Sequence, residues 1–167
     1  MPADTHEQIK DDFREAVLAA ARRDDVRQAI SLIYGELAKA TQERQPICVM
    51  SGRCCRFEEY GHRLFVTTME LASFVRELAN PGATYSSTWD GKGCPFQVGK
   101  SCGVHPIRPF GCRIFFCDPT AQIWQEQQYQ SFHARLRTLH EDLQIPYYYV
   151  EWRQALKRVL WPGAEER

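Results

Sequence analysis

The seven cysteines of this chain all lie between residues 48 and 117, and neither flank contains one. Scattered cysteines are commonly inert apolar core residues, whereas this clustering favours a shared chemical role. Because the number is odd, a closed set of disulfides would leave one thiol unpaired. The stretch ICVMSGRCCRF also places Cys54 and Cys55 side by side. Successive side chains of an extended segment point to opposite sides, so one backbone does not easily turn both onto one metal ion.

The composition is that of one ordinary globular domain. The chain has 167 residues, of which 44% are hydrophobic and 25% are charged, and 21 Lys and Arg balance 21 Asp and Glu. This length suits a single domain over residues 1–167 with a real core. The zero formal charge removes the usual electrostatic argument for binding nucleic acid or an anionic membrane. No run reaches the roughly 18 apolar residues that a membrane span needs.

The first residues, MPADTHEQIK, are polar and lack the apolar stretch of a signal peptide. We therefore expect a cytoplasmic protein, and structural disulfides are rare in that reducing compartment. Clustered cysteines there more often indicate metal binding or thiol chemistry. The partners that we expect are a metal ion or cluster and, for a binding module, another protein, but neither nucleic acid nor a membrane.

Helical patterns occupy both flanks of the cysteine-rich segment. In residues 1–45, apolar side chains recur at helical spacing in two stripes, which indicates two helices. The stripes are Ile9, Phe13, Ala16, Val17 and Ala20, and then Val26, Ile30, Ile33 and Leu37. In residues 119–167 we expect a long helix, with Asp118 as N-cap and Pro119 as first residue. A last helix is expected after Pro146, and its inward residues are Tyr149, Trp152, Leu156 and Val159.

The middle of the chain, residues 46–118, shows little regular periodicity. RLFVT at residues 63–67 has the composition of a short strand, and Thr67 with Glu70 forms a capping box that begins a helix. NPG at residues 80–82 ends that helix, and CPFQVGKSCGV predicts a hairpin that turns at VGKS. The predicted fold class is mainly α, with helices that frame a small irregular or β, cysteine-rich, metal-binding core.

The cysteines form two groups along the sequence. The first group is Cys48, Cys54 and Cys55, and the second is Cys94, Cys102, Cys112 and Cys117. A long irregular stretch inside a compact domain needs a cross-link to offset its ordering entropy, and thiolates on a metal supply one. Zinc and a 4Fe–4S cluster both accept four thiolates. No C-x-x-C pair occurs, which argues against a zinc ribbon and a thioredoxin-like motif.

The motif CVMSGRCC, followed by GCPFQVGKSCGVHPIRPFGCRIFFC, resembles the YkgJ-like family of bacterial cysteine-cluster proteins, described as zinc- or iron-chelating. The family pattern is C-x2-C-x2-CC, then CP, then a cysteine before R-P-x-x-C-R, and a final cysteine. The resemblance covers residues 48–118 and is specific in its second half. The matching positions are Cys94, Pro95, Cys102, Arg108, Pro109, Cys112, Arg113 and Cys117. The first half departs from the pattern at Ser51, since serine is a poor ligand for a soft metal.

The resemblance implies a bound metal, either zinc or an iron–sulfur cluster. Arg108 and Arg113 are candidate cofactor-binding residues, because guanidinium groups would stabilise the negative charge of either centre. The alternative is that they only brace loops through backbone carbonyls. His105, three residues after Cys102, is a weaker candidate ligand. The flagellin lysine methylases share this cysteine motif and are associated with an iron–sulfur cluster, which suggests methyl transfer.

Three functions stay open at this point. The first is a metal-binding protein with a structural or metal-handling role. The second is a cluster-dependent enzyme related to protein lysine N-methylases, although the chain has no Gly-rich loop after a strand and no radical-type C-x3-C-x2-C motif. The third is a redox-responsive thiol protein without a permanent metal, because thiol pairs also suit this compartment.

Overall fold

The computed structural model describes residues 5–79 and 89–162, and it describes side chains from residue 12 on. This part of the chain is mainly helical, as predicted. The helices are α1 (Thr5–Ala21), α2 (Asp24–Arg44), α3 (Phe57–Tyr60), α4 (Thr68–Leu78), α5 (Phe110–Ile114), α6 (Gln122–Asp142) and α7 (Trp152–Leu160). Short 3₁₀ turns are η1 (Arg53–Cys55), η2 (His105–Ile107) and η3 (Pro119–Ala121). None of the described helices is long and apolar enough to cross a bilayer.

The strands are short and pair in twos within the described residues. Strand β1 (Phe65–Thr67) is antiparallel to β4 (Tyr149–Glu151), and Val66 lies opposite Val150. Strand β2 (Gln97–Val98) is antiparallel to β3 (Ser101–Cys102), which confirms the predicted hairpin. Its turn contains Gly99 at φ +61°, a conformation that glycine adopts without strain.

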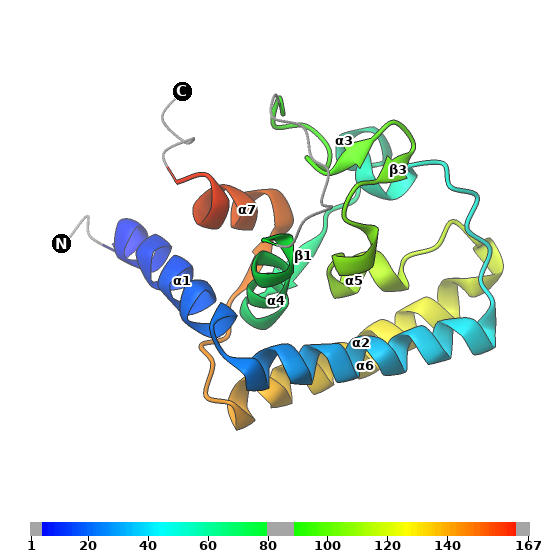
Figure 1. Cartoon of the computed structure of the whole chain (residues 1–167). Helices are drawn as coiled ribbons and strands as arrows, with labels where there is room; N and C mark the ends of the chain where they lie inside the picture. Colours follow the sequence, from blue (N-terminus) through cyan, green and yellow to red (C-terminus); the bar gives the residue numbers. More distant parts are fainter. Residues whose placement is uncertain (1–4, 80–88, 163–167) are drawn as a thin grey trace.

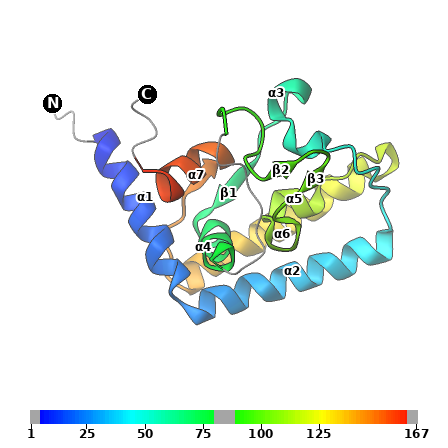
Figure 2. The same cartoon turned by 45° about the horizontal axis from the view of Figure 1, so that its top comes forward.

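The long helices α2 and α6 run along each other and form one side of the molecule (Figures 1 and 2). Helix α4 packs against α1 and α2, and α7 packs against α1. The short elements α3, α5, β2 and β3 lie nearer to the C-terminal end of α2 than α4 does (Figure 2). The cysteine-rich segment therefore sits on a helical frame built from both flanks of the sequence.

The core confirms the second N-terminal stripe and most of the first, in which Ala16 is half-buried and Ile9 lies outside the described side chains. The residues of these stripes that are buried are Phe13, Val17, Ala20, Val26, Ile30, Ile33 and Leu37. An aromatic group continues the core toward the hairpin, since the Trp152 ring lies 4.9 Å from Phe74 and 6.1 Å from Phe96. Helices α4 and α7 thereby hold the strand that follows Cys94.

The predicted start of α4 is also confirmed. Thr67 Oγ1 accepts a hydrogen bond from Glu70 N at 3.3 Å, and Glu70 Oε2 accepts one from Thr67 N at 2.8 Å. This reciprocal capping box satisfies two backbone donors that the helix itself leaves free. The predicted stop at residues 80–82 lies outside the described residues.

The C-terminal prediction needs two corrections. Asp118 accepts a hydrogen bond from Thr120 N at 2.9 Å and caps the turn η3, so the long helix begins at Gln122. The prediction that Tyr149 faces inward on the last helix is wrong, because Tyr149 begins β4 and its side chain is 39% exposed. Aromatic and β-branched residues favour strands, and β1 supplies the pairing partner. Helix α7 then begins at Trp152, whose side chain is buried as expected.

Candidate metal centre

A tight turn carries the adjacent cysteines. Gly52 adopts φ +71° and begins η1, and Cys55 N donates to Gly52 O at 3.2 Å. A Cβ atom at Gly52 would lie 2.6 Å from the Gln97 side chain and 3.1 Å from Lys100 Cα. Only glycine fits there, because the hairpin β2–β3 packs directly on the turn. The turn buries Cys55 and leaves Cys54 exposed.

The hairpin brings two further cysteines to this turn. Cys94 N donates to Cys55 O at 2.8 Å, and Gln97 Nε2 donates to Gly52 O at 3.2 Å. Gly93 adopts φ +59°, and a Cβ atom there would lie 2.9 Å from Cys55 O. Cys102 lies on β3, paired with Gln97 of β2. Backbone contacts thus join the two halves of the motif, which are some forty residues apart.

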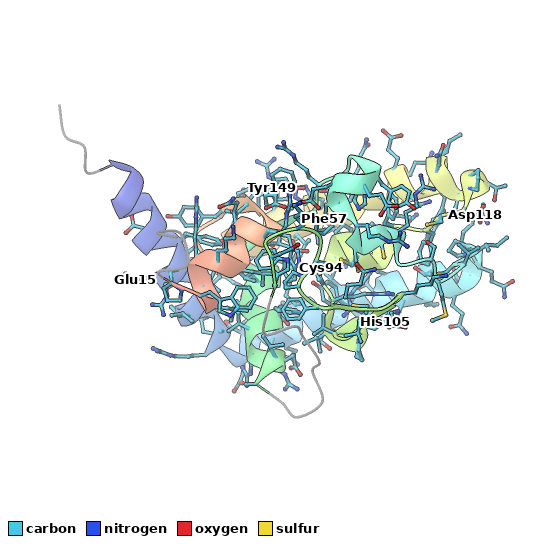
Figure 3. The ribbon with its side chains drawn as sticks, turned by 90° about the horizontal axis from the view of Figure 1, so that it is seen from above. Glu15, Phe57, Cys94, His105, Asp118 and Tyr149 are labelled. Atoms are coloured by element: carbon cyan, nitrogen blue, oxygen red, sulfur yellow. The ribbon has the colours of Figure 1, made fainter. Side chains whose placement is uncertain are left out.

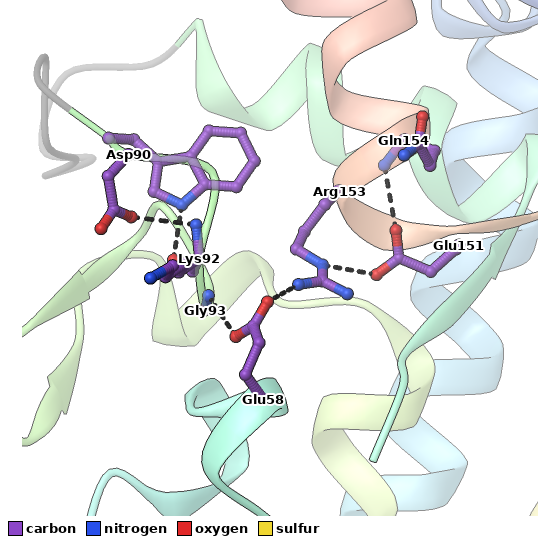
Figure 4. A network of polar contacts seen from close by, with 8 residues as sticks. Glu58, Asp90, Lys92, Gly93, Glu151, Arg153 and Gln154 are labelled. Atoms are coloured by element: carbon purple, nitrogen blue, oxygen red, sulfur yellow. Dashed lines mark hydrogen bonds and ion pairs between the residues drawn. The ribbon is translucent and has the colours of Figure 1, made fainter. Parts of the chain in front are cut away.

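A polar network anchors the chain just before Cys94 (Figure 4). Glu58 of α3 accepts a hydrogen bond from Gly93 N at 2.7 Å and forms an ion pair with Arg153 of α7. Arg153 Nε also donates to Glu151 at 2.7 Å. Glu58 therefore helps to position the backbone before Cys94 through its contacts with Gly93 and Arg153. The sequence alone did not indicate this role.

Cys112 is held in place by the buried carboxylate of Glu70. Glu70 is 2% exposed, and its Oε1 accepts a hydrogen bond from Phe110 N at 3.0 Å. The N-terminus of α5 is therefore bound to the first turn of α4. A Cβ atom at Gly111 would lie 2.5 Å from Leu64 Cδ1, so α5 also approaches the residue before β1 closely. These contacts fix the position of the short helix that carries Cys112, which is half-buried and packs against the core.

Five thiols gather where these segments meet: Cys54, Cys55, Cys94, Cys102 and Cys112. The Cys55 thiol lowers the pKa of Cys54 to about 6 and also lowers the pKa of Cys94. In return, Cys54 and Cys94 raise the pKa of Cys55. Burial raises the pKa of Cys102 and Cys112, and negative charge on Cys94 raises both further. Cys54 and Cys94 thus each act on Cys55, Cys102 and Cys112, so all five thiols lie within range of these two side chains.

The remaining cysteines lie apart from this group. Cys117 Sγ is 4.0 Å from Ser51 Oγ, so the serine that departs from the family pattern faces the last cysteine of that pattern. Asp118, next to Cys117, lies far from the central Cys94 and toward one end of the molecule (Figure 3). Cys48 is exposed, and the N–H of its neighbour Ile47 donates to Asp118 Oδ2 at 3.1 Å, so Cys48 lies near Asp118. The structure therefore brings five of the seven predicted ligands together.

The two predicted cofactor-binding arginines differ in their contacts. Arg113 Nε donates to Arg108 O at 2.7 Å, and its Nη2 donates to Pro106 O at 2.9 Å. Arg113 therefore braces the loop through backbone carbonyls, as the alternative prediction had it. Its guanidinium also lies 4.0 Å from the centre of the Tyr34 ring. Arg108 is close enough to Cys54, Cys102 and Cys112 to favour their charged forms. Its buried Nε has no hydrogen-bond partner.

Two aromatic residues near the thiols were not predicted as site residues. The Trp152 indole favours the thiolate form of Cys94, and its Nε1 is buried with no oxygen or nitrogen partner. The helical spacing around Trp152 predicted only that this residue lies in the core. His62 packs nearby, with Nε2 3.1 Å from Cys54 O and its ring stacked on Phe115. The candidate ligand His105 is exposed.

A cavity of about 430 Å³ opens beside Cys54 and Cys112. Most of its wall is apolar, and the residues concerned are Phe57, Leu64, Phe65, Ile114, Phe115, Tyr129 and Tyr149. A small molecule in this cavity would contact two of the five thiols. An apolar pocket with a few convergent polar groups is the usual form of a ligand site.

The metal-binding part of the predicted core is not shown by the structure. Within residues 5–79 and 89–162, no three His, Cys, Asp or Glu side chains form a group that could hold a metal ion. The comparisons add no relative, since no family model, curated protein or solved structure matches this chain. The similarity to the YkgJ-like family therefore stays a prediction from the motif.

Glu70 provides a test of how α5 is anchored. Burial raises the pKa of Glu70 to about 6, despite hydrogen bonds that act in the opposite direction. Because this folded value exceeds the unfolded value of about 4.3, Glu70 stabilises the fold below about pH 4, and the contribution is lost as the pH rises through about 6. The pKa difference corresponds to about 2 kcal/mol.

We therefore expect the stability deficit of Glu70→Gln relative to wild type to be about 2 kcal/mol larger at about pH 4 than at about pH 7. Urea unfolding at both pH values measures this difference. Glu59→Gln is the control for the substitution itself, because Glu59 carries the same carboxyl group at an exposed position. A deficit for Glu70→Gln that is equal at both pH values would contradict the buried-carboxylate argument.

Proposed function

We propose that this protein holds a metal centre, zinc or a 4Fe–4S cluster, through thiolates of the five-cysteine group, and that the centre has a structural or metal-handling role. The observation that carries the proposal is the convergence of Cys54, Cys55, Cys94, Cys102 and Cys112 from three separate segments. Thiolates are the ligands that zinc and iron–sulfur clusters prefer. Either centre takes four thiolates, and we assign to it Cys94, Cys102 and Cys112 together with one member of the adjacent pair Cys54 and Cys55.

The surroundings of the group fit an anionic centre. Four thiolates exceed the charge of one zinc ion by two, and an iron–sulfur cluster with four thiolates is also negative. The charge of Arg108 favours the thiolate forms of Cys54, Cys102 and Cys112, and the Trp152 indole favours that of Cys94. Such donors stabilise thiolate ligands. Because the thiols are not in coordinating positions, we expect metal binding to draw them together and to be coupled to folding.

A second candidate function is that of a cluster-dependent enzyme related to protein lysine N-methylases. The apolar cavity beside Cys54 and Cys112 favours this candidate, because a purely structural centre does not need a pocket at its ligands. Calorimetric titration with a methyl donor tests it directly. Saturable binding supports the enzyme, and no binding counts against it.

Anaerobic purification, followed by metal analysis and an absorption spectrum, tests the metal proposal. We expect bound metal at one centre per chain. Brown protein with iron and sulfide identifies a cluster, and colourless protein with zinc identifies a zinc site. Metal-free protein that is fully folded would overturn the proposal. That outcome would leave a redox-responsive thiol protein, for which the exposed Cys54 is the reactive candidate.

A further inference from the structure

A separate cavity, of about 250 Å³, lies between α2 and the segment that leads into α5. One face of α2 forms most of its wall, and Arg108, just before α5, and Arg113, within α5, close it. The lining residues are Tyr34, Leu37, Ala38, Thr41, Gln42, Arg108 and Arg113. None of them is acidic and none is a cysteine, so the five-cysteine group does not line this cavity, although Arg108 lies near both.

The charge of this cavity is positive and lacks a matching carboxylate in its wall. Arg108 and Arg113 both line it, and the charge of Arg108 acts unfavourably on Arg113. Glu70 is the acidic group that Arg113 influences, but both oxygens of Glu70 already accept backbone N–H groups. The thiols near Arg108 lie outside the cavity wall. The fold thus holds two guanidinium groups together against their mutual repulsion.

Two buried donors at this cavity lack an acceptor in the described part of the chain. Arg108 Nε is buried without a hydrogen-bond partner, and the buried Tyr34 hydroxyl has no acceptor for its proton. Arg113 uses Nε and Nη2 on two backbone carbonyls, which fix the plane of its guanidinium. A buried donor that stays unpaired destabilises the fold, and such donors are uncommon in native proteins. Their presence at one cavity therefore favours a bound ligand that accepts hydrogen bonds.

We propose that this cavity is a binding site for a small oxyanion, with a phosphate group as the favoured class. Guanidinium forks match the oxygens of phosphate and carboxylate groups, and two positive charges favour a dianion over a monoanion. The Thr41 hydroxyl and the Gln42 amide supply uncharged donors at the same wall. The volume leaves room for a phosphate that is carried on a small organic molecule.

Thermal unfolding of the full chain, as purified, tests the proposal. Wild type is compared in chloride, inorganic phosphate, sulfate and acetate at constant pH and ionic strength. We expect a saturable rise in Tm with phosphate, about 4 °C at tenfold excess over the dissociation constant. An equal rise with acetate would identify the oxyanion as a carboxylate. No rise with any of the oxyanions would overturn the proposal.

A substitution in the cavity wall tests whether phosphate binds in this cavity and not elsewhere on the protein. Thr41→Glu places a carboxylate beside the two arginines on a helix that tolerates glutamate. We expect this variant to have a higher Tm than wild type in chloride and to lose the response to phosphate. Gln28→Glu, an exposed position on α2 outside the cavity, should keep the wild-type response. A full phosphate response in Thr41→Glu would place the binding elsewhere and overturn the assignment.

Metal content, measured on the same samples, separates this inference from the metal proposal. The cavity contains no cysteine, so a metal-free protein that still responds to phosphate would overturn only the metal proposal. Conversely, a metal-loaded protein without any oxyanion response would overturn only the oxyanion site.

Discussion

Cys112→Ser is expected to lose bound metal and the folded state together. Cys112 is the thiol that α5 contributes to the five-cysteine group, and Cys102→Ser should act in the same way from the hairpin. Folding stabilities of domains are about 5–15 kcal/mol, and a structural zinc site contributes free energy of a similar size. Loss of one ligand should therefore leave the chain largely unfolded at 25 °C. Metal per chain and circular dichroism measure the two losses.

The exposed Cys48 provides the matched control for this experiment. Cys48→Ser should keep both metal and fold, because its thiol lies outside the five-cysteine group. Cys112→Ala should behave like Cys112→Ser, which shows that the buried hydroxyl of serine is not the cause. Full metal content in Cys112→Ser would remove Cys112 from the ligands, and unfolding of Cys48→Ser would show that the group is assigned incorrectly.

Trp152→Ala should cause the second large loss. The side chain is 1% exposed, and it packs on Phe74 and on Phe96, which follows Cys94 by two residues. Replacing a buried tryptophan by alanine costs about 3–5 kcal/mol, and the cavity left behind would loosen the hairpin that carries Cys94 and Cys102. We therefore expect lower metal content as well as a lower midpoint in urea unfolding.

Trp152→Phe separates packing from the indole donor. Phenylalanine keeps an aromatic ring packed against Phe74 and Phe96, so the variant should retain most of the stability. It lacks the Nε1–H donor of the indole. Because the indole favours the Cys94 thiolate, the variant should bind metal more weakly than wild type. Ile123→Ala, at a side chain 74% exposed, should change stability by less than about 0.5 kcal/mol. A similarly small effect of Trp152→Ala would contradict the packing argument.

Local sequence signals predicted the elements whose contacts are local. The stripes of α1 and α2 depend on helical periodicity, and the capping box of Thr67 and Glu70 depends on hydrogen bonds between residues three apart. The hairpin of residues 97–102 depends on its own turn. Each of these elements can be predicted from its own segment, without knowledge of the rest of the fold.

Tyr149 shows where local reasoning failed. Its spacing to Trp152 and Leu156 fits a helix, yet Tyr149 pairs with Thr67, which is 82 residues earlier in the chain. Strand formation needs a partner, and periodicity within one segment does not reveal a partner so distant. The dual role of Glu70 was missed for the same reason, because its second acceptor atom serves Phe110 of α5.

The amino-acid sequence by itself determined the helical flanks, the capping box, the hairpin and the confinement of all thiols to one segment, since these follow from periodicity, short-range hydrogen bonds and composition. Only the tertiary structure decided how the thiols are grouped. Close backbone approaches at Gly52 and Gly93 join Cys55 to the hairpin, while Cys117 faces Ser51 instead. Long-range packing sets these distances, so spacing along the chain does not predict them.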